Sequence, residues 1–593
     1  MATSKRIEIL LDGESKAFRF ASQTGLDSQI RLSFRYGSVV PFELLDSTEA
    51  IVPISDLEDG QTYIMRRCSG DDWSTRPMWQ TKDSIHGLIC LPDVCVRIID
   101  TPEFQRLRDL KQTGSCNLVY MGSHHTRFDH SLGVAYLAFR MATSISERQP
   151  ELNVSARDIL CVTIAALCHD MGHGPGSHMW DSAVLKRLGV DMPHEEMSLL
   201  IFDYIITTTR EKWRHTDPFD GLTNDDLLFI KALIHPPKTI TPETVGRNSD
   251  KIFLMDIVSN KASGLDVDKF DYIMRDTYNT GVRGVFDIDR LIRNVVVREC
   301  DGLLTMCWPQ KELEGIVEIF HTRDSLHRRV YQHRTNTSIE SMFRDAALLA
   351  APAMQIRNSG GEWISFKEAQ LDVTTFTKIS DWIFHFLMFG QDFKIDWSDP
   401  RVAQARTLLE DIRYRKIWKF VGTVFGKIDD YERVKQELEK FSGGYIAAEQ
   451  WELKTAMFSW GKGDRNPLEN VPFIRKDNEE PMRPKPEDLS RVFVPASFRE
   501  HVLYVYIKSQ DNEVRELARS AFSQWCTERG IESSLVDMSS VTLSKRARRK
   551  SISAPATPAV SRRPTVGLTP SEPSTPLVRK TSITKKSSPK TRK

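Results

Sequence analysis

The sequence of 593 residues predicts a mainly α-helical protein with a small α+β module at its N-terminus and a disordered tail at its C-terminus. Three observations lead to this expectation. Apolar residues recur at helical spacing through most of residues 83–531. Residues 1–68 show short strand-like segments separated by turns. Residues 532–593 are dominated by Ser, Thr, Pro, Lys and Arg, a composition that does not form a packed core.

The N-terminal module combines predicted strands with one predicted helix. Four strands are expected, over residues 6–11, 16–20, 41–45 and 61–67. Between the second and the third, apolar side chains recur every four residues from Leu26 to Phe34, as on a helix, although the alternation over residues 30–36 also fits a strand. The order resembles a ubiquitin-like β-grasp fold. Binding of an unknown protein partner is its favoured function, and a folding appendage is the alternative.

A linker and a long helical region follow. Residues 69–82 contain glycine, proline and acidic residues and are predicted to be a linker. Within residues 83–531, Thr223 begins one helix through a Thr-Asn-Asp-Asp capping sequence, and Ser155 caps another whose apolar face runs to Cys168. We therefore expect one helical core with a C-terminal lobe over this range.

Charge and cysteine content indicate the compartment. The formal net charge is +1, but residues 541–593 hold fourteen Lys or Arg against the single acid Glu572 and carry +13, which leaves −12 on residues 1–540. The nine cysteines are scattered, as in a reduced cytosolic or nuclear protein. The longest apolar stretch, Leu160 to Cys168, is too short to span a bilayer, and the N-terminus lacks the apolar segment of a secretory signal. No association with a membrane is expected.

The most informative segment is Ala166-Leu-Cys-His-Asp-Met-Gly-His-Gly-Pro-Gly-Ser-His178. His169 and Asp170 end an apolar helix pattern, and the glycines and proline that follow stop the helix. Adjacent His and Asp side chains at the edge of a core need a partner, because an unpaired buried charge is unfavourable. A bound cation would be such a partner.

Two further segments extend this pattern, His125-Thr-Arg-Phe-Asp-His130 before it and Gly264-Leu-Asp-Val-Asp268 after it. The ordered set His, His-Asp, Asp resembles the metal quartet of the HD phosphohydrolase superfamily. Two imidazoles and two carboxylates suit an octahedral first-row ion with open positions, whereas structural zinc favours Cys-rich sites. A structural metal or satisfied core histidines are the alternatives. The implied ligands are His130, His169, Asp170 and Asp268.

Longer segments resemble one narrower family. They include Ile99-Asp-Thr-Pro-Glu-Phe-Gln-Arg-Leu-Arg108, Phe320-His-Thr-Arg-Asp-Ser-Leu-His-Arg-Arg-Val-Tyr-Gln-His333 and Tyr414-Arg-Lys-Ile-Trp-Lys419. From about Asp83 to Cys526 the chain resembles the SAM- and HD-domain-containing deoxynucleoside triphosphate (dNTP) triphosphohydrolases of animals, with the β-grasp module in place of the SAM domain. The resemblance implies hydrolysis of a dNTP to deoxynucleoside and inorganic triphosphate. It also implies one transition metal ion, with zinc, iron and manganese all compatible, and Mg²⁺ with the bound nucleotides.

The same resemblance assigns roles to individual residues. His173 and His194 would contact the phosphates. His178, oriented by Asp181, would be the general acid that protonates the leaving 5′ oxygen, since an imidazole pKa lies near operating pH. Surface histidines and ordinary salt bridges are the alternatives. The triphosphate would be neutralised by Arg127, Lys269 and Arg323, and the sugar would be read by Gln112, Tyr272, Asp276 and Tyr331, with Thr113 in place of the family's leucine.

The family is activated as a homotetramer bridged by GTP and a dNTP. Asp100, Gln105 and Arg108 match the guanine-reading residues, and a capped helix start at Asp100-Thr-Pro with ion pairs is the structural alternative. Pro309 stands where the family has an arginine, and Trp79-Gln80-Thr81 replaces its Lys-Val-Ile. The second effector site and the bridging phosphates would be contacted by Val119, Tyr120, Arg290, Lys311, His333, Arg334, Arg415, Lys419 and Lys476.

The basic tail suggests regulation. Residues 545–550, Lys-Arg-Ala-Arg-Arg-Lys, are typical of a nuclear import signal, with solvated charge as the alternative. Four Ser-Pro or Thr-Pro sites, at Thr557, Thr569, Thr575 and Ser588, predict a phosphoprotein. A +13 segment also predicts weak binding of single-stranded nucleic acid.

These residues are compatible with three functions. The favoured one is a nuclear, and also cytoplasmic, dNTP triphosphohydrolase that lowers dNTP pools and restricts viruses in innate immunity. The first rival is a nucleotide-regulated scaffold or nucleic-acid-binding protein, against which the intact set His130, His169, Asp170 and Asp268 argues. The second is a phosphodiesterase or nuclease on the same metal site, against which the sugar and triphosphate residues argue.

Overall fold

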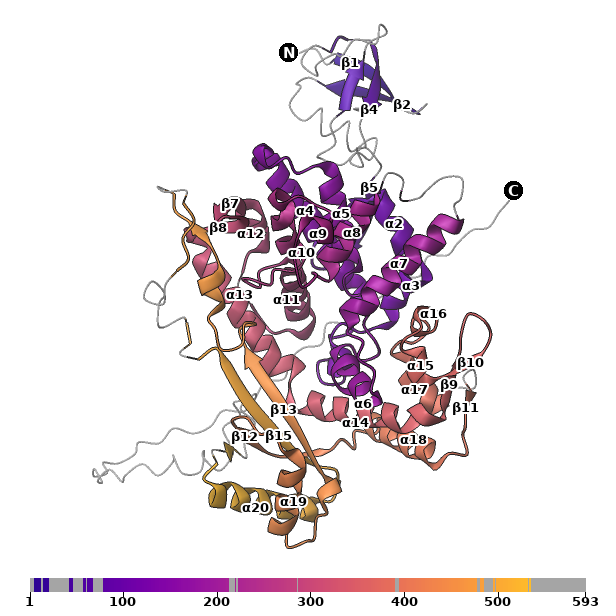
Figure 1. Cartoon of the computed structure of the whole chain (residues 1–593), viewed down its shortest axis with the longest axis vertical. Coiled ribbons are helices and arrows are strands. Elements are labelled where there is room, and N and C mark those ends of the chain that lie inside the picture. The colour runs from indigo at the N-terminus through magenta and orange to yellow at the C-terminus, as the bar shows by residue number, and fades with distance from the viewer. Residues whose placement is uncertain are drawn as a thin grey trace, which may run out of the picture. The chain divides into compact units, whose positions relative to one another are not determined.

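The computed structural model describes most of the helical core and parts of both ends (Figure 1). The predicted helix over residues 26–34 and the predicted tail from residue 535 on, with its import signal and phosphorylation sites, lie outside the described residues. The tail predicted from residue 532 is wrong at its start, because Ser533 and Ser534 form a short strand paired with Thr423 and Val424. The described residues are 5–11, 14–20, 42–45, 57–59, 61–67, 78–212, 219, 222–284, 286–389, 394–476, 480–484, 494–495, 497–531 and 533–534.

A four-stranded sheet makes up the described part of the N-terminal module. Its strands are β1 (Lys5–Leu11), β2 (Glu14–Phe20), β3 (Phe42–Leu45) and β4 (Thr62–Arg67). The order in the sheet is β2-β1-β4-β3, with β1 antiparallel to β2 and parallel to β4. Ile7 and Ile9 alternate along β1 as buried side chains. All four predicted strands are confirmed, and their order is that of a β-grasp sheet.

A hairpin precedes the helices. β5 (Met78–Asp83) pairs antiparallel with β6 (Gly87–Pro92). The linker predicted over residues 69–82 is therefore wrong at its C-terminal end. The reason lies in the turn, where the Asp83 carboxylate accepts hydrogen bonds from the backbone N–H groups of Ile85 and His86 and Gly87 has φ +72°. The residues that close the hairpin, Asp83 to Gly87, lie just beyond the predicted linker.

Helices dominate residues 93–413, which confirms the mainly α-helical prediction. The predicted helix starts at Ser155 and Thr223 are both confirmed as N-caps with complete capping boxes. None of the helices in the described part is long and apolar enough to cross a membrane. The helices before residue 300 are α2 (Asp93–Ile99), α3 (Pro102–Gln105), α4 (Arg127–Arg148), α5 (Ala156–Cys168), α6 (Lys186–Leu188), α7 (His194–Lys212), α8 (Asn224–Ile234), α9 (Pro242–Val245), α10 (Met255–Val258), α11 (Val267–Thr280) and α12 (Ile288–Asn294).

A second group of helices follows. The helices at residues 334–350, 366–369, 382–389 and 400–413 pack around a separate apolar cluster that includes Trp180, Ile339 and Leu409. Those at residues 313–326 and 373–376 pack into the cluster of the preceding helices. The helices of this second group are α13 (Leu313–Leu326), α14 (Arg334–Ala350), α15 (Phe366–Ala369), α16 (Val373–Phe376), α17 (Trp382–Phe389) and α18 (Pro400–Arg413). The short strands of this region are β7 (Val296–Cys300), β8 (Leu303–Pro309), β9 (Met354–Arg357), β10 (Trp363–Ser365) and β11 (Lys394–Ile395).

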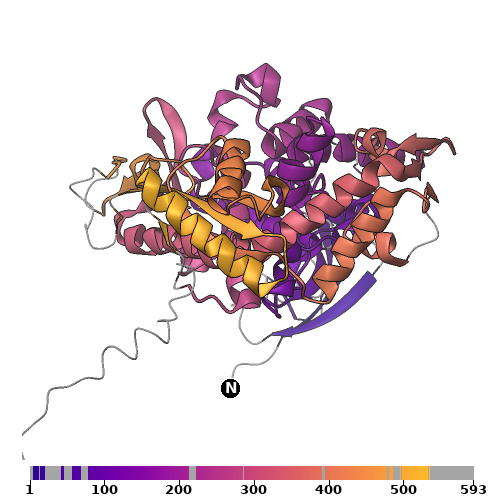
Figure 2. The same ribbon diagram turned by 90° about the horizontal axis from the view of Figure 1, so that it is seen from below.

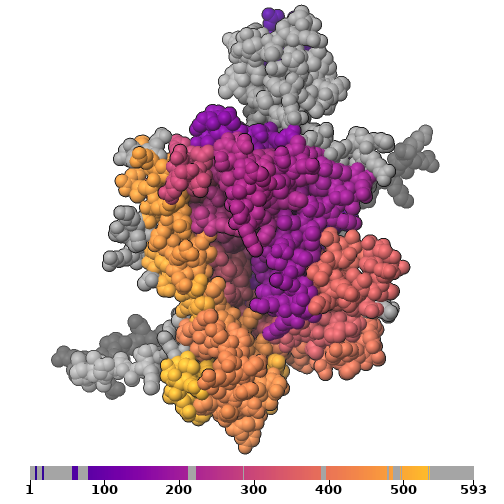
Figure 3. Space-filling view, in the orientation of Figure 1, coloured from indigo at the N-terminus to yellow at the C-terminus, as the bar shows by residue number. Residues whose placement is uncertain are grey.

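The C-terminal lobe is a sheet covered by two helices. The order is β13-β15-β12-β16, and α20 lies across its strands (Figure 2). A bulge in β12 before Gly422 lets Phe522 of α20 pack against the backbone there. In the space-filling view, orange segments of this lobe lie against the magenta helical segments (Figure 3). The lobe contains β12 (Lys419–Phe425), α19 (Tyr431–Phe441), β13 (Trp451–Ser459), β14 (Phe473–Ile474), β15 (Arg499–Ile507), α20 (Asn512–Arg529) and β16 (Ser533–Ser534).

Candidate active site

Three helices bring the four predicted metal ligands together. His130 lies in the first turn of α4, and Asp268 is the second residue of α11. His169 and Asp170 directly follow α5, where the apolar helix ends as predicted. One helix end and two helix starts thus converge, and each can deliver a polar side chain without breaking the apolar packing behind it.

The distances between the ligand atoms fit one metal ion. His130 Nε2 lies 3.1 Å from Asp268 Oδ1 and 3.5 Å from Asp170 Oδ2. His169 Nε2 lies 3.6 Å from Asp268 Oδ1 and 3.5 Å from Asp170 Oδ1. Atoms about 2.1 Å from one ion at right angles are about 3 Å apart. Both Nε2 atoms are buried and have no hydrogen-bond partner among the described residues. Two orphaned imidazole nitrogens facing two carboxylates are a donor set for a transition metal.

A buried carboxylate fixes one of these imidazoles from behind. Asp271 Oδ2 lies 2.7 Å from His130 Nδ1, and Asp271 Oδ1 lies 2.6 Å from His86 Nε2. Arg275 donates to both oxygens of Asp271 at 2.9 Å. A Cβ atom on Gly133 would stand 1.9 Å from Asp271 Oδ1, so only glycine fits there. Such a carboxylate orients a metal-binding histidine and raises its basicity.

The loop after His169 is held by two buried side chains from elsewhere in the chain. The Arg106 guanidinium donates to the carbonyl oxygens of Met171, at 3.2 Å, and His173, at 2.7 Å. The Asp381 carboxylate accepts from the N–H of Gly176 at 2.7 Å. The loop's own backbone hydrogen bonds are those of short turns, such as His173 N–H to the Asp170 carbonyl at 3.3 Å, and these side-chain contacts add to them in holding the histidines.

Arg127 joins this loop to the metal ligands. Its guanidinium forms an ion pair with Asp170 and donates to Ser177 Oγ at 3.1 Å. Ser177 has φ +59°, a conformation that non-glycine residues seldom adopt, and its hydroxyl donates to the Lys111 carbonyl at 2.7 Å. Burial opposes ionisation of Asp170, but Arg127, His169 and His173 together outweigh it and hold the pKa of Asp170 well below its usual range.

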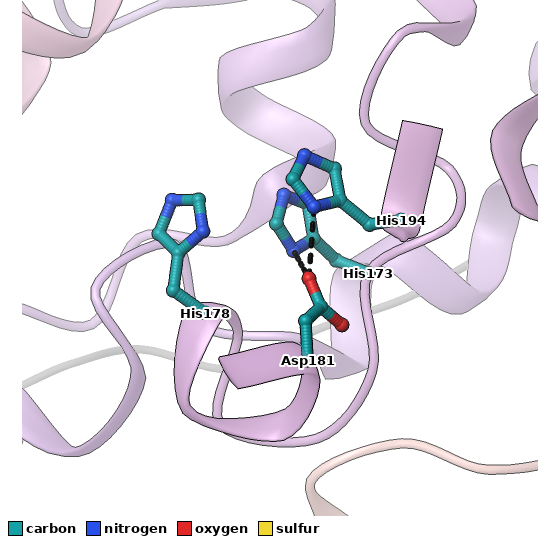
Figure 4. Close-up of side chains that lie close together, drawn as sticks. All are labelled: His173, His178, Asp181 and His194. Carbon is teal, nitrogen blue, oxygen red and sulfur yellow. Dashed lines mark hydrogen bonds and ion pairs between the residues drawn. The ribbon is translucent and has the colours of Figure 1, made fainter. Parts of the chain in front are cut away.

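A second cluster contains the four predicted catalytic residues, His173, His178, Asp181 and His194 (Figure 4). The rings of His173 and His194 are stacked 3.8 Å apart, and the His178 ring lies 4.9 Å from that of His173. Asp181 Oδ2 is 2.8 Å from His194 Nδ1 and 3.7 Å from His173 Nδ1. The carboxylate that was expected to orient His178 is therefore hydrogen-bonded to His194 instead.

The protonation of His178 also differs from expectation. Burial, followed by the positive charges of Arg127 and His194, lowers the pKa of His178 to about 4. A pKa near operating pH was expected from the sequence. The neutral ring is favoured at neutral pH because burial and the nearby positive charges together exceed the opposing effects of Asp170 and Asp268 on the His178 pKa.

These groups line a cavity of about 620 Å³. His169, Asp170 and Asp268 lie on its wall, together with His173, His178 and His194, while His130 and Asp181 stand behind it. The structure brings all eight predicted substrate residues to this one cavity. They are Gln112, Thr113, Arg127, Lys269, Tyr272, Asp276, Arg323 and Tyr331.

Two of the predicted sugar-reading residues, Asp276 and Tyr331, are held by hydrogen bonds. The Tyr331 hydroxyl donates to Asp276 Oδ2 at 2.5 Å, and His125 Nε2 lies 2.6 Å from Asp276 Oδ1. The Thr113 hydroxyl is 2.6 Å from that of Ser123, so its polar group is satisfied within the protein. A tyrosine ring held at its hydroxyl forms the rigid wall that steric selection of a sugar requires.

None of the twelve predicted effector residues lines this cavity. Asp100 is exposed at the end of α2. The alternative of a capped helix start at Asp100-Thr-Pro is confirmed, with Thr101 as the residue that caps α3 at Pro102. Gln105 donates to the Ile99 carbonyl at 2.7 Å and accepts from Arg108 at 2.8 Å. Gln105 and Arg108 are therefore held as a hydrogen-bonded pair, five and eight residues after an exposed carboxylate.

The remaining effector residues come from several elements. The rings of Tyr120 and His333 are 6.3 Å apart, and Arg415, with φ +60°, donates to the Leu118 carbonyl at 2.8 Å. Arg290 pairs with Glu312 at 2.9 Å. The others are Val119 after a 3₁₀ turn, Lys311 after β8, Arg334 at the start of α14, Lys419 at the start of β12, and exposed Lys476 after β14.

Several residues of the site were not predicted from the sequence. Asp271 stands one helical turn after Asp268, and that spacing was the signal for it. Arg106, Asp381 and His125 had no such signal, because their partners are distant in sequence. All eight cysteines in the described part of the chain are free thiols, as expected.

Comparison with known proteins identifies the family. An HD domain matches residues 127–232, the segment that contains His130, His169 and Asp170. The deoxynucleoside triphosphate triphosphohydrolase SAMHD1 of human is 37% identical over 468 residues, which cover 76% of this chain and 73% of the human protein. The chicken enzyme of that name is 37% identical over 75% of both chains. The cattle enzyme is 37% identical over 75% of this chain and 77% of its own. The chain is an enzyme of the SAMHD1 family of deoxynucleoside triphosphate triphosphohydrolases.

Proposed function

We propose that this enzyme hydrolyses dNTPs to deoxynucleoside and inorganic triphosphate in the 620 Å³ cavity. The observation that supports it most directly is the convergence of the metal quartet, the second histidine cluster and all eight substrate residues on one cavity. A phosphodiesterase or nuclease would not need three cationic side chains for a terminal triphosphate. A scaffold would not need the ligand set His130, His169, Asp170 and Asp268.

The cations of the cavity bind the triphosphate. Lys269 stays close to its own carboxylate, with Nζ 2.9 Å from Asp266, and Arg323 donates to the Ser459 carbonyl at 2.6 Å. Arg127 is paired with Asp170. Each cation is therefore positioned by the protein and has donors left over for phosphate oxygens.

A bound transition metal ion would polarise a phosphoryl oxygen and lower the pKa of a water molecule. His130, His169, Asp170 and Asp268 would hold it, with Zn, Fe and Mn all compatible, and Mg²⁺ would accompany the nucleotide. The α-phosphorus is the point of attack, so the bond from phosphorus to the 5′ oxygen breaks.

His178 protonates the departing 5′ oxygen. Its pKa of about 4 in the unliganded protein leaves it neutral, so it must gain a proton when substrate binds. A triphosphate placed beside it supplies the negative charge that raises the pKa of a buried imidazole. His194, held by Asp181, and His173, stacked on His194, contact the phosphates.

Hydrolysis in ¹⁸O-labelled water tests this route. Attack at the α-phosphorus places one ¹⁸O in the inorganic triphosphate and none in the deoxynucleoside. Label in the deoxynucleoside, or release of deoxynucleoside monophosphate and pyrophosphate, would contradict the proposal.

We further propose that GTP and a dNTP activate the enzyme by assembling a homotetramer, and that the enzyme lowers dNTP pools as part of antiviral innate immunity. The exposed Asp100 carboxylate and the hydrogen-bonded Gln105–Arg108 pair that follows it in the sequence support a guanine site, since a carboxylate can accept from N1–H and the amine while arginine donates to O6. The basic residues 545–550 support a nuclear location alongside the cytoplasm. Sedimentation with and without GTP, and microscopy of the tagged protein, test these points.

A further inference from the structure

One end of the cavity has no role in the scheme above. Thr337 and Glu340 of α14 line it on one side, and Lys454 to Met457 of β13 line it on the other. Gln332, next to the sugar-reading Tyr331, also lies on this wall. A carboxylate and an ammonium group therefore face the same space beside the site of the sugar.

The Glu340 carboxylate is positioned by a short network. Asn336 donates through Nδ2 to Glu340 Oε1 at 3.1 Å and to the Tyr331 carbonyl at 3.0 Å. Asn336 Oδ1 accepts in turn from the Ser115 hydroxyl at 2.6 Å. Glu340 Oε2 receives no hydrogen bond from any residue that the structure describes. Burial raises the pKa of Glu340 to about 7, against the opposing effects of Lys454 and Asn336.

Lys454 has an unused donor group. Among the described residues it makes no hydrogen bond or ion pair, and it does not pair with Glu340 although both line the cavity. Burial lowers the pKa of Lys454. Close by, Gln332 Nε2 donates to the Met457 carbonyl at 3.1 Å, while its Oε1 is buried with no partner in the described part of the chain. Three polar groups thus point to a ligand that supplies both donors and acceptors.

We propose that this end of the cavity binds the nucleobase, and that Glu340 and Lys454 read its Watson–Crick edge with guanine preferred. The proposal rests on the proposed hydrolysis of dNTPs and names a substrate preference within it. Guanine presents N1–H and the exocyclic amine side by side, with O6 next to them. A carboxylate can accept from both N–H groups while an ammonium group donates to O6. Adenine, cytosine and thymine each offer a carboxylate only one Watson–Crick donor group.

Internal competition is the sharpest test. The full-length protein is incubated with equal concentrations of the four dNTPs and a fixed concentration of GTP, and the depletion of each is followed in the same tube. The ratios of the depletion rates report the ratios of kcat/KM, and the state of activation cancels because all four substrates share one enzyme population. The wild type is expected to deplete dGTP fastest.

Two variants assign the residues. Glu340→Gln removes the acceptor for two N–H groups, and roughly a tenfold or greater loss of dGTP preference over dTTP is expected for a lost charged hydrogen bond. Lys454→Gln replaces a donor to O6 with a group that can also accept a hydrogen bond. The ratio of kcat/KM for dGTP to kcat/KM for dATP should therefore fall. Glu410→Gln and Lys440→Gln, exposed and outside the cavity, are the matched controls and should keep the wild-type ratios.

Thermal melting of each variant accompanies the assay, and either folded variant suffices for the test. Unchanged ratios in the folded variants would overturn the proposal, as would an equal loss of activity for all four substrates. A wild type that shows no preference for dGTP would also overturn it while leaving dNTP hydrolysis in place. If no dNTP releases triphosphate at all, the proposed function itself fails.

Discussion

The predicted metal ligands at one end of the cavity differ from the predicted effector residues on the surface. The difference is the share of each group's contacts that this one chain supplies. At the metal end, His130 and Asp170 each have a second protein partner, and the ligand atoms stand 3.1–3.6 Å apart. Asp100, by contrast, is exposed and its carboxylate has no partner in the described part of the molecule. One chain therefore supplies the surroundings of the predicted metal ligands, whereas it leaves the Asp100 carboxylate exposed.

This difference indicates how the two sites would work. A preorganised site binds substrate without waiting for an ordering step, because its side chains are already held. An exposed group such as Asp100 gains its partners only when a nucleotide, and by our proposal a second copy of the chain, comes to it. Each subunit would then carry out hydrolysis with its own residues, whereas activation would require several subunits.

The largest effect is expected at the metal end. Replacing His169 and Asp170 together with alanine removes half of the protein ligands and should abolish triphosphate release. Metal content after dialysis and product formation are the measurements. Full hydrolysis by a metal-free double variant would contradict the metal-dependent mechanism.

Asp271→Asn is the next largest change. The carboxylate that orients His130 is lost, and metal affinity should fall roughly 10- to 100-fold, as for other second partners of metal-binding histidines. Metal retention against a graded chelator measures this. The control is Asp289→Asn, an exposed carboxylate paired with Arg140 far from the cavity wall. Equal chelator sensitivity of the wild type and Asp271→Asn would show that Asp271 has only a structural role.

Asp100→Ala should act on assembly and leave the chemistry intact. Loss of a hydrogen bond to a charged group weakens binding by roughly 1.5–3 kcal/mol, so the variant should need about 10- to 100-fold more GTP to assemble. Activity should recover once assembly does, since a ligand shared between subunits stabilises the oligomer by mass action. The measurement is the GTP concentration at half-maximal assembly, and a wild-type value would remove Asp100 from the guanine site.

The smallest effect on turnover should follow deletion of residues 541–593. The active site lies outside this +13 segment, so kcat should stay within about twofold of wild type while the protein moves from nucleus to cytoplasm. Fluorescence microscopy and the triphosphate assay are run on the same truncated protein. Unchanged nuclear signal would refute the import role.

Local chemistry explains what the sequence could predict. The caps Ser155 and Thr223 could be predicted because the residues of a capping box lie within four consecutive positions of the sequence. Strands β1 to β4 were recognisable from turns and alternation. The metal quartet and the cavity residues came from motifs of the family, and the structure brings them together.

Contacts between distant segments explain the rest. His86 reaches Asp271 across 185 residues, and Arg106 reaches the Ile379 carbonyl across 273. Asp181 has the right spacing to serve His178, but its oxygen turns to His194. Glu340 and Lys454 face one cavity only because α14 lies beside the C-terminal sheet. None of these contacts produces a periodic pattern in the sequence from which it could be predicted.

The most direct test of the contrast between the two regions is a GTP titration in which sedimentation velocity and triphosphate release from one dNTP are measured on the same wild-type samples. The account predicts that tetramer and activity rise together with GTP, while bound metal stays constant from the smallest species to the largest. Full activity of a GTP-independent monomer would contradict it, as would assembly that changes the metal content.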